Sequence, residues 1–483
     1  MKKEQHHWTF CPDCQSLGKK KRRIKKSLRL RYQEELEKFE KGNGKGAPPV
    51  RPEAQLYICP TCSGSGLIPC ENPPAPDSEN YPHVAIIGGG IGGVALAVAC
   101  LHRGIPFTLY ERDTSFDERS QGYGLTLQQA SKAIEGFGIL HLEKGVVSTR
   151  HLVHTPEGKI VGEWGMRKWL ETENTPKSSH KKTNIHIARQ SLRLALLDQL
   201  GGSKSVQWGH QLLDFKENKE HGIELNFLVD GKAKTEKADL IVGADGIRSA
   251  VRSLLIGEEI SPLRYLDCIV ILGICPLSAL QDVESSLLDS ATVFQTANGN
   301  ERIYVMPFDA ESVMWQLSFP LSEEEAKILS IKGPKALKEE AIRRTQWHAP
   351  IPQILAATQE AQISGYPVYD RALLQPELLE KARAATLIGD AAHPMSPFKG
   401  QGANQALLDA LSLAREIFKN CQPFSQWRES GIRKSVLIPF ENKMLERSKS
   451  KVIDSAAAAQ FLHSEIALYK GDEPRGRILK RQS

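Results

Sequence analysis

The strongest constraint on the fold is a nearly uncharged run, VAIIGGGIGGVALAVACL, which spans Val84 to Leu101. Its 18 residues reach the minimum length of a membrane span. Five of them are glycines crowded toward one end, however, and each glycine weakens a helix by about 1 kcal/mol. The residues before the glycines are β-branched, as in a buried strand, whereas those after them are rich in Ala and Leu, as in a helix. The run therefore predicts a strand, a glycine turn and a helix rather than a membrane span.

Three of these glycines have the spacing of a dinucleotide-binding turn. Gly88, Gly90 and Gly93 form G-x-G-x-x-G, in which the first permits a tight turn, the second admits a pyrophosphate and the third lets the helix pack on the strand. The start of that helix offers unpaired N–H groups to phosphates. A second apolar stretch, IPFTLYE, ends at Glu111, where this fold places a carboxylate for ribose hydroxyls. We therefore expect dinucleotide binding.

Three later stretches indicate a particular family. ADLIVGADGIRSAVR (Ala238 to Arg252) is typical of a strand, an Asp-Gly turn and a helix. ATLIGDAAHPMSPFKGQGANQALLDALSLA (Ala385 to Ala414) is typical of a strand ending in Gly-Asp, a loop, and a helix that begins near Gln401. Together with ARQSLRLALL and the glycine turn, these motifs resemble the group A flavoprotein monooxygenases, the family of para-hydroxybenzoate hydroxylase, over roughly residues 82–438.

The resemblance implies a set of contacts to FAD. It places the pyrophosphate on the glycine turn, the adenosine ribose on Glu111, the ribityl region on Asp390 and the isoalloxazine ring on the loop at 397–404. A helix that begins near Gln401 would also stabilise the negative charge of a reduced flavin. The Asp-Gly turn is associated with both FAD and the pyridine nucleotide. The implied cofactor-binding residues are Gly88, Gly90, Gly93, Glu111, Arg119, Arg189, Asp245, Gly246, Asp390, Pro397, Gly400, Gln401, Gly402, Ala403 and Asn404.

The resemblance also implies an activity. NAD(P)H would reduce FAD, O2 would form a C4a-hydroperoxyflavin, and one oxygen atom would be transferred to a small aromatic substrate. Outside the glycine turn, no G-x-G-x-x-G follows a strand, so we expect no separate domain for NAD(P)H. We name no catalytic base. His186 is a candidate proton relay, although a structural histidine is the favoured interpretation.

The segment at 261–367 alternates apolar and polar residues and predicts an antiparallel sheet. In the family that the chain resembles, such a sheet covers the substrate pocket. Because alternation does not tell which face meets the pocket, we expect about half of the candidates to belong to the core. These candidates are Phe294, Tyr304, Met306, Met314, Trp315 and Gln316.

The N-terminal segment departs from the family pattern. Two C-x-x-C pairs, Cys11 with Cys14 and Cys59 with Cys62, suit tetrahedral Zn2+ bound by four thiolates. The 44 residues between the pairs exceed the usual separation and include a predicted helix at 25–40. Reduced free thiols are the alternative, and Cys70 is a substitute ligand. A structural zinc site is the favoured interpretation.

Positive charge is concentrated beside these cysteines. Nine Lys and Arg residues lie from Lys19 to Arg31 without an acid, which exceeds the net charge of +6 for the whole chain. The run is a solvated helix face, an RNA contact or a contact to an acidic partner, in that order of preference. The N-terminus lacks a secretory signal and the cysteine pattern suits a reducing compartment, so we expect a cytoplasmic protein.

These observations predict an α/β fold: a Rossmann-like FAD-binding domain with an inserted antiparallel sheet. The leading function is an FAD-dependent NAD(P)H monooxygenase. A flavin-dependent hydroxylase recruited to RNA (tRNA) or a protein by the zinc module, and a non-catalytic flavin sensor or scaffold, are the alternatives. The expected parts are a zinc-ribbon-like module at 1–75, the FAD-binding domain at 76–260 and 368–420, the substrate sheet at 261–367 and C-terminal helices at 421–483.

Overall fold

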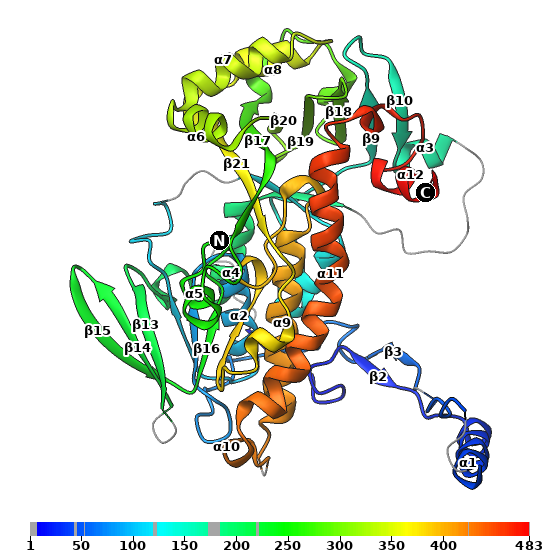
Figure 1. Ribbon diagram of the computed structural model, residues 1–483, viewed down its shortest axis with the longest axis vertical. Coiled ribbons are helices and arrows are strands. Elements are labelled where there is room, and N and C mark those ends of the chain that lie inside the picture. Colours follow the sequence, from blue (N-terminus) through cyan, green and yellow to red (C-terminus); the bar gives the residue numbers. More distant parts are fainter. Residues whose placement is uncertain are drawn as a thin grey trace. The chain divides into compact units, whose positions relative to one another are not determined.

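The computed structural model divides the chain into two compact units, Met1–Ala75 and Pro76–Ser483. We describe each unit by itself (Figure 1). The residues that the structure describes are 7–42, 46–52, 54–118, 123–171, 184–218, 222–423 and 425–482.

The first unit contains two small antiparallel sheets. Strand β1 (His7–Phe10) pairs with β4 (Leu67–Cys70), and β2 (Lys19–Lys21) pairs with β3 (Leu56–Ile58). Each C-x-x-C pair lies in the connection between strands of different sheets, just after β1 or β3. Helix α1 (Lys26–Lys41) follows β2 and has no buried residue among those described. The buried cluster among the described residues of this unit therefore consists mainly of cysteines.

The second unit is built around a parallel sheet with the strand order β12-β6-β5-β16-β22. Its central strand β5 is buried along its whole length, as expected for a parallel strand covered on both faces. The strands are β5 (Val84–Ile87), β6 (Phe107–Tyr110), β12 (Val206–Gln207), β16 (Leu240–Gly243) and β22 (Ala385–Leu387). The helices of this region are α2 (Ile91–Leu101), α4 (Arg189–Gln199), α5 (Ala250–Ile256) and α9 (Gly402–Asn420).

The topology explains why distant motifs meet. Strands β5, β16 and β22 are neighbours and run parallel, so their carboxyl ends lie at one edge of the sheet. The glycine turn, the Asp-Gly turn and the Gly-Asp turn each follow one of these strands. This edge is where open α/β sheets bind their ligands.

A seven-stranded sheet has the order β10-β9-β18-β19-β20-β17-β21. All neighbouring pairs are antiparallel except β9 with β18, which is parallel. The sheet is not confined to 261–367, because β9 and β10 come from the segment expected in the FAD-binding domain and β21 continues past that range. The strands are β9 (Arg150–His154), β10 (Ile160–Trp164), β17 (Leu263–Pro276), β18 (Thr292–Ala297), β19 (Arg302–Pro307), β20 (Ser312–Pro320) and β21 (Ile363–Arg371).

One face of this sheet forms a core with helices α6 (Glu323–Ile331), α7 (Pro334–Arg344) and α8 (Ile351–Ala357) (Figure 1). Trp315 is fully buried in that core, and its indole N–H donates a hydrogen bond to Thr358 Oγ1 at 2.9 Å. Trp315 is therefore one of the pocket candidates that belong to the core. Its neighbours Met314 and Gln316 point to the opposite face, as the period of two in a strand requires.

Smaller elements complete the unit, and among the described residues no helix is both long and apolar enough to cross a membrane. Helices α9 and α11 lie side by side (Figure 1). One three-stranded sheet contains β7 (Gly124–Leu127), β8 (Val146–Val147) and β11 (Ile185–Ala188), and another contains β13 (Gln211–Asn218), β14 (Gly222–Val229) and β15 (Lys232–Ala238). The remaining α-helices are α3 (Met166–Glu171), α10 (Trp427–Ser430), α11 (Ile438–Phe461) and α12 (Arg475–Gln482).

Candidate active site

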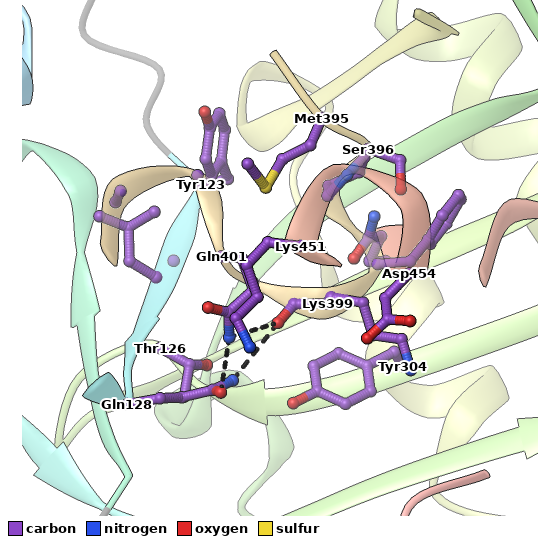
Figure 2. A pocket seen from close by; sticks show the side chains of 18 of the residues that line it. Tyr123, Thr126, Gln128, Tyr304, Met395, Ser396, Lys399, Gln401, Lys451 and Asp454 are labelled. Atoms are coloured by element: carbon purple, nitrogen blue, oxygen red, sulfur yellow. Dashed lines mark hydrogen bonds between the residues drawn. The ribbon is translucent and has the colours of Figure 1, made fainter. Parts of the chain in front are cut away.

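A cavity of about 1210 Å³ lies between the ligand-binding edge of the parallel sheet and the open face of the seven-stranded sheet. It is large enough for a cofactor ring and a small substrate together. Its wall includes the glycine turn, the loop before α9, strands β18 to β20, and residues of α11 and α12. Figure 2 shows Gln128 and Gln401, joined by a hydrogen bond of 2.7 Å, beside Thr126 and Lys399.

The glycine turn has no room for side chains at its two ends. Gly88 has φ +109°, and a Cβ atom there would lie 2.6 Å from the carbonyl oxygen of Ala244. A Cβ at Gly93 would lie 1.9 Å from the carbonyl oxygen of Gly88. Gly90 precedes α2, whose first turn receives no side-chain cap. The turn thus presents free backbone N–H groups and a helix N-terminus, which are the features that bind a pyrophosphate.

Charged side chains hold this turn from both sides. Glu111 Oε2 accepts a hydrogen bond of 2.7 Å from the backbone N–H of Gly89. Arg193 Nε donates to the carbonyl oxygen of Gly89 at 2.7 Å. A Cβ at Gly90 would lie 3.7 Å from Arg189 Nη2. Arg193 is not among the residues that the sequence motifs predict, although it lies one helical turn after Arg189 and so on the same face of α4.

The Asp-Gly turn is oriented by the helix that follows it. Asp245 accepts hydrogen bonds from the hydroxyl of Ser249 and from the backbone N–H of Ala250 at 2.7 Å. Its carboxylate therefore caps the N-terminus of α5 and does not line the cavity, whereas Gly246 does. Arg252 donates from Nη1 to two carbonyl oxygens of the Gly-Asp loop, at 2.8 and 2.9 Å. This guanidinium joins the two turns.

The Gly-Asp turn depends on a buried network that the sequence motifs do not predict. Asp409, on α9, accepts hydrogen bonds from the backbone N–H of Gly389 at 2.8 Å and from His393 Nε2 at 2.6 Å. Arg447 on α11 also donates to it. Asp390 itself is exposed to the cavity. Desolvation by the surrounding protein raises the pKa of its carboxyl, while His393 and Arg189 oppose the shift. The sequence contained one signal for this network, because Asp409 lies seven residues into a predicted helix that is otherwise largely apolar.

Asn404 fixes the loop before α9. Its side-chain oxygen accepts hydrogen bonds from the backbone N–H groups of Gln128 and Ala130, at 2.8 and 3.1 Å. Its Nδ2 donates to the carbonyl oxygens of Thr126 and Gly400, both at 2.8 Å. The loop is thereby tied to β7 and to the segment that follows it. The first turn of α9 has no side-chain cap, so its N–H groups and dipole are available at the cavity wall.

The predicted FAD contacts therefore converge around one cavity, and the donor set fits a dinucleotide with a negatively charged ring edge. Five of the predicted residues lie behind the wall and shape it: Gly88, Gly93, Glu111, Asp245 and Asn404. Arg119 lies outside the described residues. Those that line the cavity are Gly90, Arg189, Gly246, Asp390, Pro397, Gly400, Gln401, Gly402 and Ala403.

The opposite wall comes from the open face of the seven-stranded sheet. Of the six candidates, four present their side chains to the cavity: Tyr304, Met306, Met314 and Gln316. Phe294 borders the cavity, but its side chain is fully buried in the same core as that of Trp315. The C-terminal helices α11 and α12 also contribute to the wall, and nothing in the sequence pattern had indicated this. The four side chains from the sheet give the wall one aromatic ring and two thioethers, which suit a planar apolar substrate.

His186 lies on β11, behind the residues that line the cavity. Its Nδ1 is 3.1 Å from Thr126 Oγ1 and its Nε2 is 2.8 Å from Ser148 Oγ, which is in turn 3.3 Å from His151 Nε2. Thr126, Ser148 and His151 line the cavity, whereas His186 is fully buried. Burial, together with the charge of His151, lowers the pKa of His186 to about 3, so the ring is neutral at neutral pH. Its contacts join β7, β8 and β11, and its role as a proton relay stays a prediction.

The cysteine pairs of the first unit form a compact cluster. The Sγ atoms of Cys11, Cys14, Cys59 and Cys62 all lie within 4.8 Å of one another. Two of these separations are 4.0 and 3.7 Å, close to the value of about 3.8 Å expected for thiolates around tetrahedral Zn2+. The backbone N–H groups of Gly18 and Gly66 each donate to one of the sulfurs. Cys70 is not in the cluster; its thiol contacts the carbonyl oxygen of Asn72.

Comparisons with known proteins agree with this geometry. Residues 81–422 match the family described as FAD binding domain. Aurachin C monooxygenase/isomerase of Stigmatella aurantiaca is 31% identical over 337 residues, which cover 69% of this chain and 79% of that protein. The 3-amino-4-hydroxybenzoate 2-monooxygenase of Streptomyces platensis is 27% identical over 345 residues, covering 70% and 80%.

Solved structures share the fold. HpxO of Klebsiella pneumoniae, in complex with FAD and uric acid, superposes with a TM-score of 0.63 at 20% identity and covers 83% of this chain and 92% of its own. The parallel sheet with its glycine turn, the second sheet over the cavity and these matches lead to one conclusion. The chain belongs to the FAD binding domain family, among the flavoprotein monooxygenases related to para-hydroxybenzoate hydroxylase.

Proposed function

We propose that the protein uses FAD, NAD(P)H and O2 to hydroxylate a small aromatic compound. The observation that carries this proposal is that one cavity joins a dinucleotide cradle to a wall that contains aromatic side chains. A relative named for 3-amino-4-hydroxybenzoate supports the aromatic class of substrate.

Bound FAD would supply electron transfer from NAD(P)H and the activation of O2. The chain's own residues would hold and orient it. The glycine turn would bind the pyrophosphate through backbone N–H groups, and Glu111, which already contacts Gly89, would accept hydrogen bonds from the ribose. Asp390 would accept hydrogen bonds from the ribityl hydroxyls, since it is the acidic group on this part of the wall.

The N-terminus of α9 would stabilise negative charge at the edge of the ring. Its first N–H groups face the cavity and carry the positive end of the helix dipole. Asn404 would keep these donors in place, because it ties their loop to β7. The seven-stranded sheet would exclude water from the substrate end, which protects reactive oxygen species from side reactions.

The test is consumption of NADH and of NADPH by the full chain across phenols, indoles, tetracyclines and nucleosides. The expected result is oxidation stimulated by one class, with matching O2 uptake and a product heavier by one oxygen atom. Slow oxidation that no compound stimulates, without an oxygenated product, would favour a flavin-bound sensor or scaffold instead.

We further propose that the cysteine cluster binds one structural Zn2+. Four buried sulfurs with near-tetrahedral separations support this proposal. Metal analysis of the purified chain should find one equivalent of zinc, which a chelator removes together with the fold of the first unit. Protein without metal and with four reactive thiols would contradict it. The described residues offer no observation that favours an RNA partner for the basic segment Lys19 to Arg31.

A further inference from the structure

Helix α1 of the first unit lies apart from the other elements of that unit. Figure 1 shows it set away from strands β2 and β3. Among the described residues of the unit, it makes no extended contact with any other helix or strand, and none of its own residues is buried. Most helical stability in proteins comes from the packing of an apolar face, and α1 obtains little of it within its own unit.

The helix nevertheless has an apolar face. Four of its residues share one side, because they follow one another at intervals of four, four and three positions. They are Leu28, Tyr32, Leu36 and Phe39, which we call the α1 stripe. Leu28 is 47% exposed and the other three are partly exposed. A stripe with this spacing is typical of a helix that packs against another element.

The chain does little to stabilise the start of α1. The N-cap residue Lys25 makes no side-chain cap hydrogen bond, and the first turn contains no acidic residue. Lys26 and Arg29 instead place positive charge at the positive end of the helix dipole, which is unfavourable. A helix of 16 residues is marginal in water by itself. The α1 stripe therefore indicates a partner that supplies the missing contacts.

Charge is segregated along the helix. Residues 26–31 carry three positive charges and no negative charge, whereas residues 32–41 contain four glutamates and two lysines. Arg29 and Glu40 are 11 positions apart, which is about three helical turns. They therefore lie on the same edge of the α1 stripe, near its two ends.

This distribution of charge decides between the partners that an amphipathic helix with a basic end can bind. An anionic membrane surface or RNA would attract the first half of α1 but repel the glutamates of the second half. A second copy of α1 in antiparallel orientation suits both halves, because the basic half of each helix then lies against the acidic half of the other. A parallel copy would place like charges opposite each other.

We propose that α1 is a self-association surface through which two copies of this chain pair antiparallel. With the helices crossing at the middle of the stripe, Leu28 of each copy packs against Phe39 of the other. The same register places Arg29 of each copy beside Glu40 of the other. Because a pair of 16-residue helices is small compared with the roughly 1,200 Å² of a stable interface, we expect a weak dimer, with a Kd of about 1–100 μM.

The test is sedimentation equilibrium of the full-length protein from about 1 to about 300 μM, with circular dichroism and the thermal midpoint as checks on folding. Leu28 and Leu30 are equally exposed, at 47%, but lie about 200° apart around the helix. We expect Leu28→Gln to weaken the dimer by about 10- to 30-fold, because each dimer loses two buried leucines. The matched control Leu30→Gln should leave the Kd within about twofold.

An exchange of charges tests the antiparallel arrangement. Arg29→Glu and Glu40→Arg should each weaken the dimer by about 3- to 10-fold at low salt, because attractive pairs become repulsive. Combined in one chain, the two substitutions should restore the affinity of the wild type. Each single change suits the helix dipole, so loss of the helix would not explain a weaker dimer. The control Glu34→Arg makes the same change of charge on the face opposite the stripe and should leave the Kd within about twofold.

A protein that stays monomeric at every concentration would overturn the inference. So would a dimer that Leu28→Gln leaves intact, or a charge exchange that fails to restore affinity. A monomer that binds tRNA, or vesicles of phosphatidylcholine and phosphatidylserine, and loses this binding in Leu28→Gln would assign the α1 stripe to that partner instead. The measurement requires neither substrate nor turnover, so its outcome is independent of the proposed function.

Discussion

Replacing Gly93 with alanine tests the glycine turn where it is tightest. The new Cβ would lie 1.9 Å from the carbonyl oxygen of Gly88, whereas Cβ atoms in proteins do not approach closer than 3.0 Å. The backbone must therefore separate by roughly 1.1 Å at the point where a pyrophosphate would bind. Overpacking of this kind costs about 3 kcal/mol, which corresponds to a loss of FAD affinity of roughly 100-fold.

The adjacent Gly92 provides the control. A Cβ at Gly92 would meet Ala406 at 3.5 Å and Ile388 at 3.8 Å, which are ordinary contacts. Alanine there should also stabilise α2 by about 0.5–1 kcal/mol. We therefore expect Gly92→Ala to bind FAD within threefold of the wild type.

The assay is titration of deflavinated protein with FAD, followed by calorimetry or by quenching of flavin fluorescence, with circular dichroism as the check on folding. A folded Gly93→Ala variant should bind FAD roughly 100-fold more weakly than the Gly92→Ala variant. Equal affinity of the two folded variants would refute the steric account of the turn and its assignment to the pyrophosphate.

Three further predictions concern the groups around the cavity and the cysteine cluster. Asn404→Ala removes four hydrogen bonds from a side chain to the backbone and should weaken FAD binding by about 3 kcal/mol. The control Asn420→Ala, at the other end of α9, should leave FAD binding unchanged. Equal effects of the two substitutions would contradict the role of Asn404. Cys59→Ser should abolish metal binding in metal analysis but leave the FAD content unchanged, because the cluster belongs to the first compact unit; loss of FAD would contradict this. Burial disfavours the charged form of His393, but Asp409 outweighs it and raises the pKa of His393. The pair therefore stabilises the fold fully below about pH 6.5, and less as the pH rises through the folded-state pKa of His393. The difference in Tm between wild type and His393→Asn should shrink with rising pH. A difference that stays constant would refute the pairing.

Local spacing explains what the sequence could predict. The glycine turn and the C-x-x-C pairs each depend on residues a few positions apart, whose geometry short-range sterics determine. Their convergence on one sheet edge was predictable only through the family resemblance. The parallel pairing of β5, β16 and β22 brings together residues more than 100 positions apart.

The remaining features depend on packing between distant segments. The alternation in β20 did not reveal that Trp315 faces the core, because either face of a strand satisfies a period of two. Alternation also did not reveal that β9 belongs to this sheet, because its parallel partner β18 lies more than 100 residues away in the sequence.

The most direct test of the account is the FAD content of the purified full-length chain. We expect the protein to be yellow, with one FAD per chain retained or regained on addition of the cofactor. A colourless protein that folds, yet binds no added FAD, would contradict the assignment of the cavity and every function proposed for it.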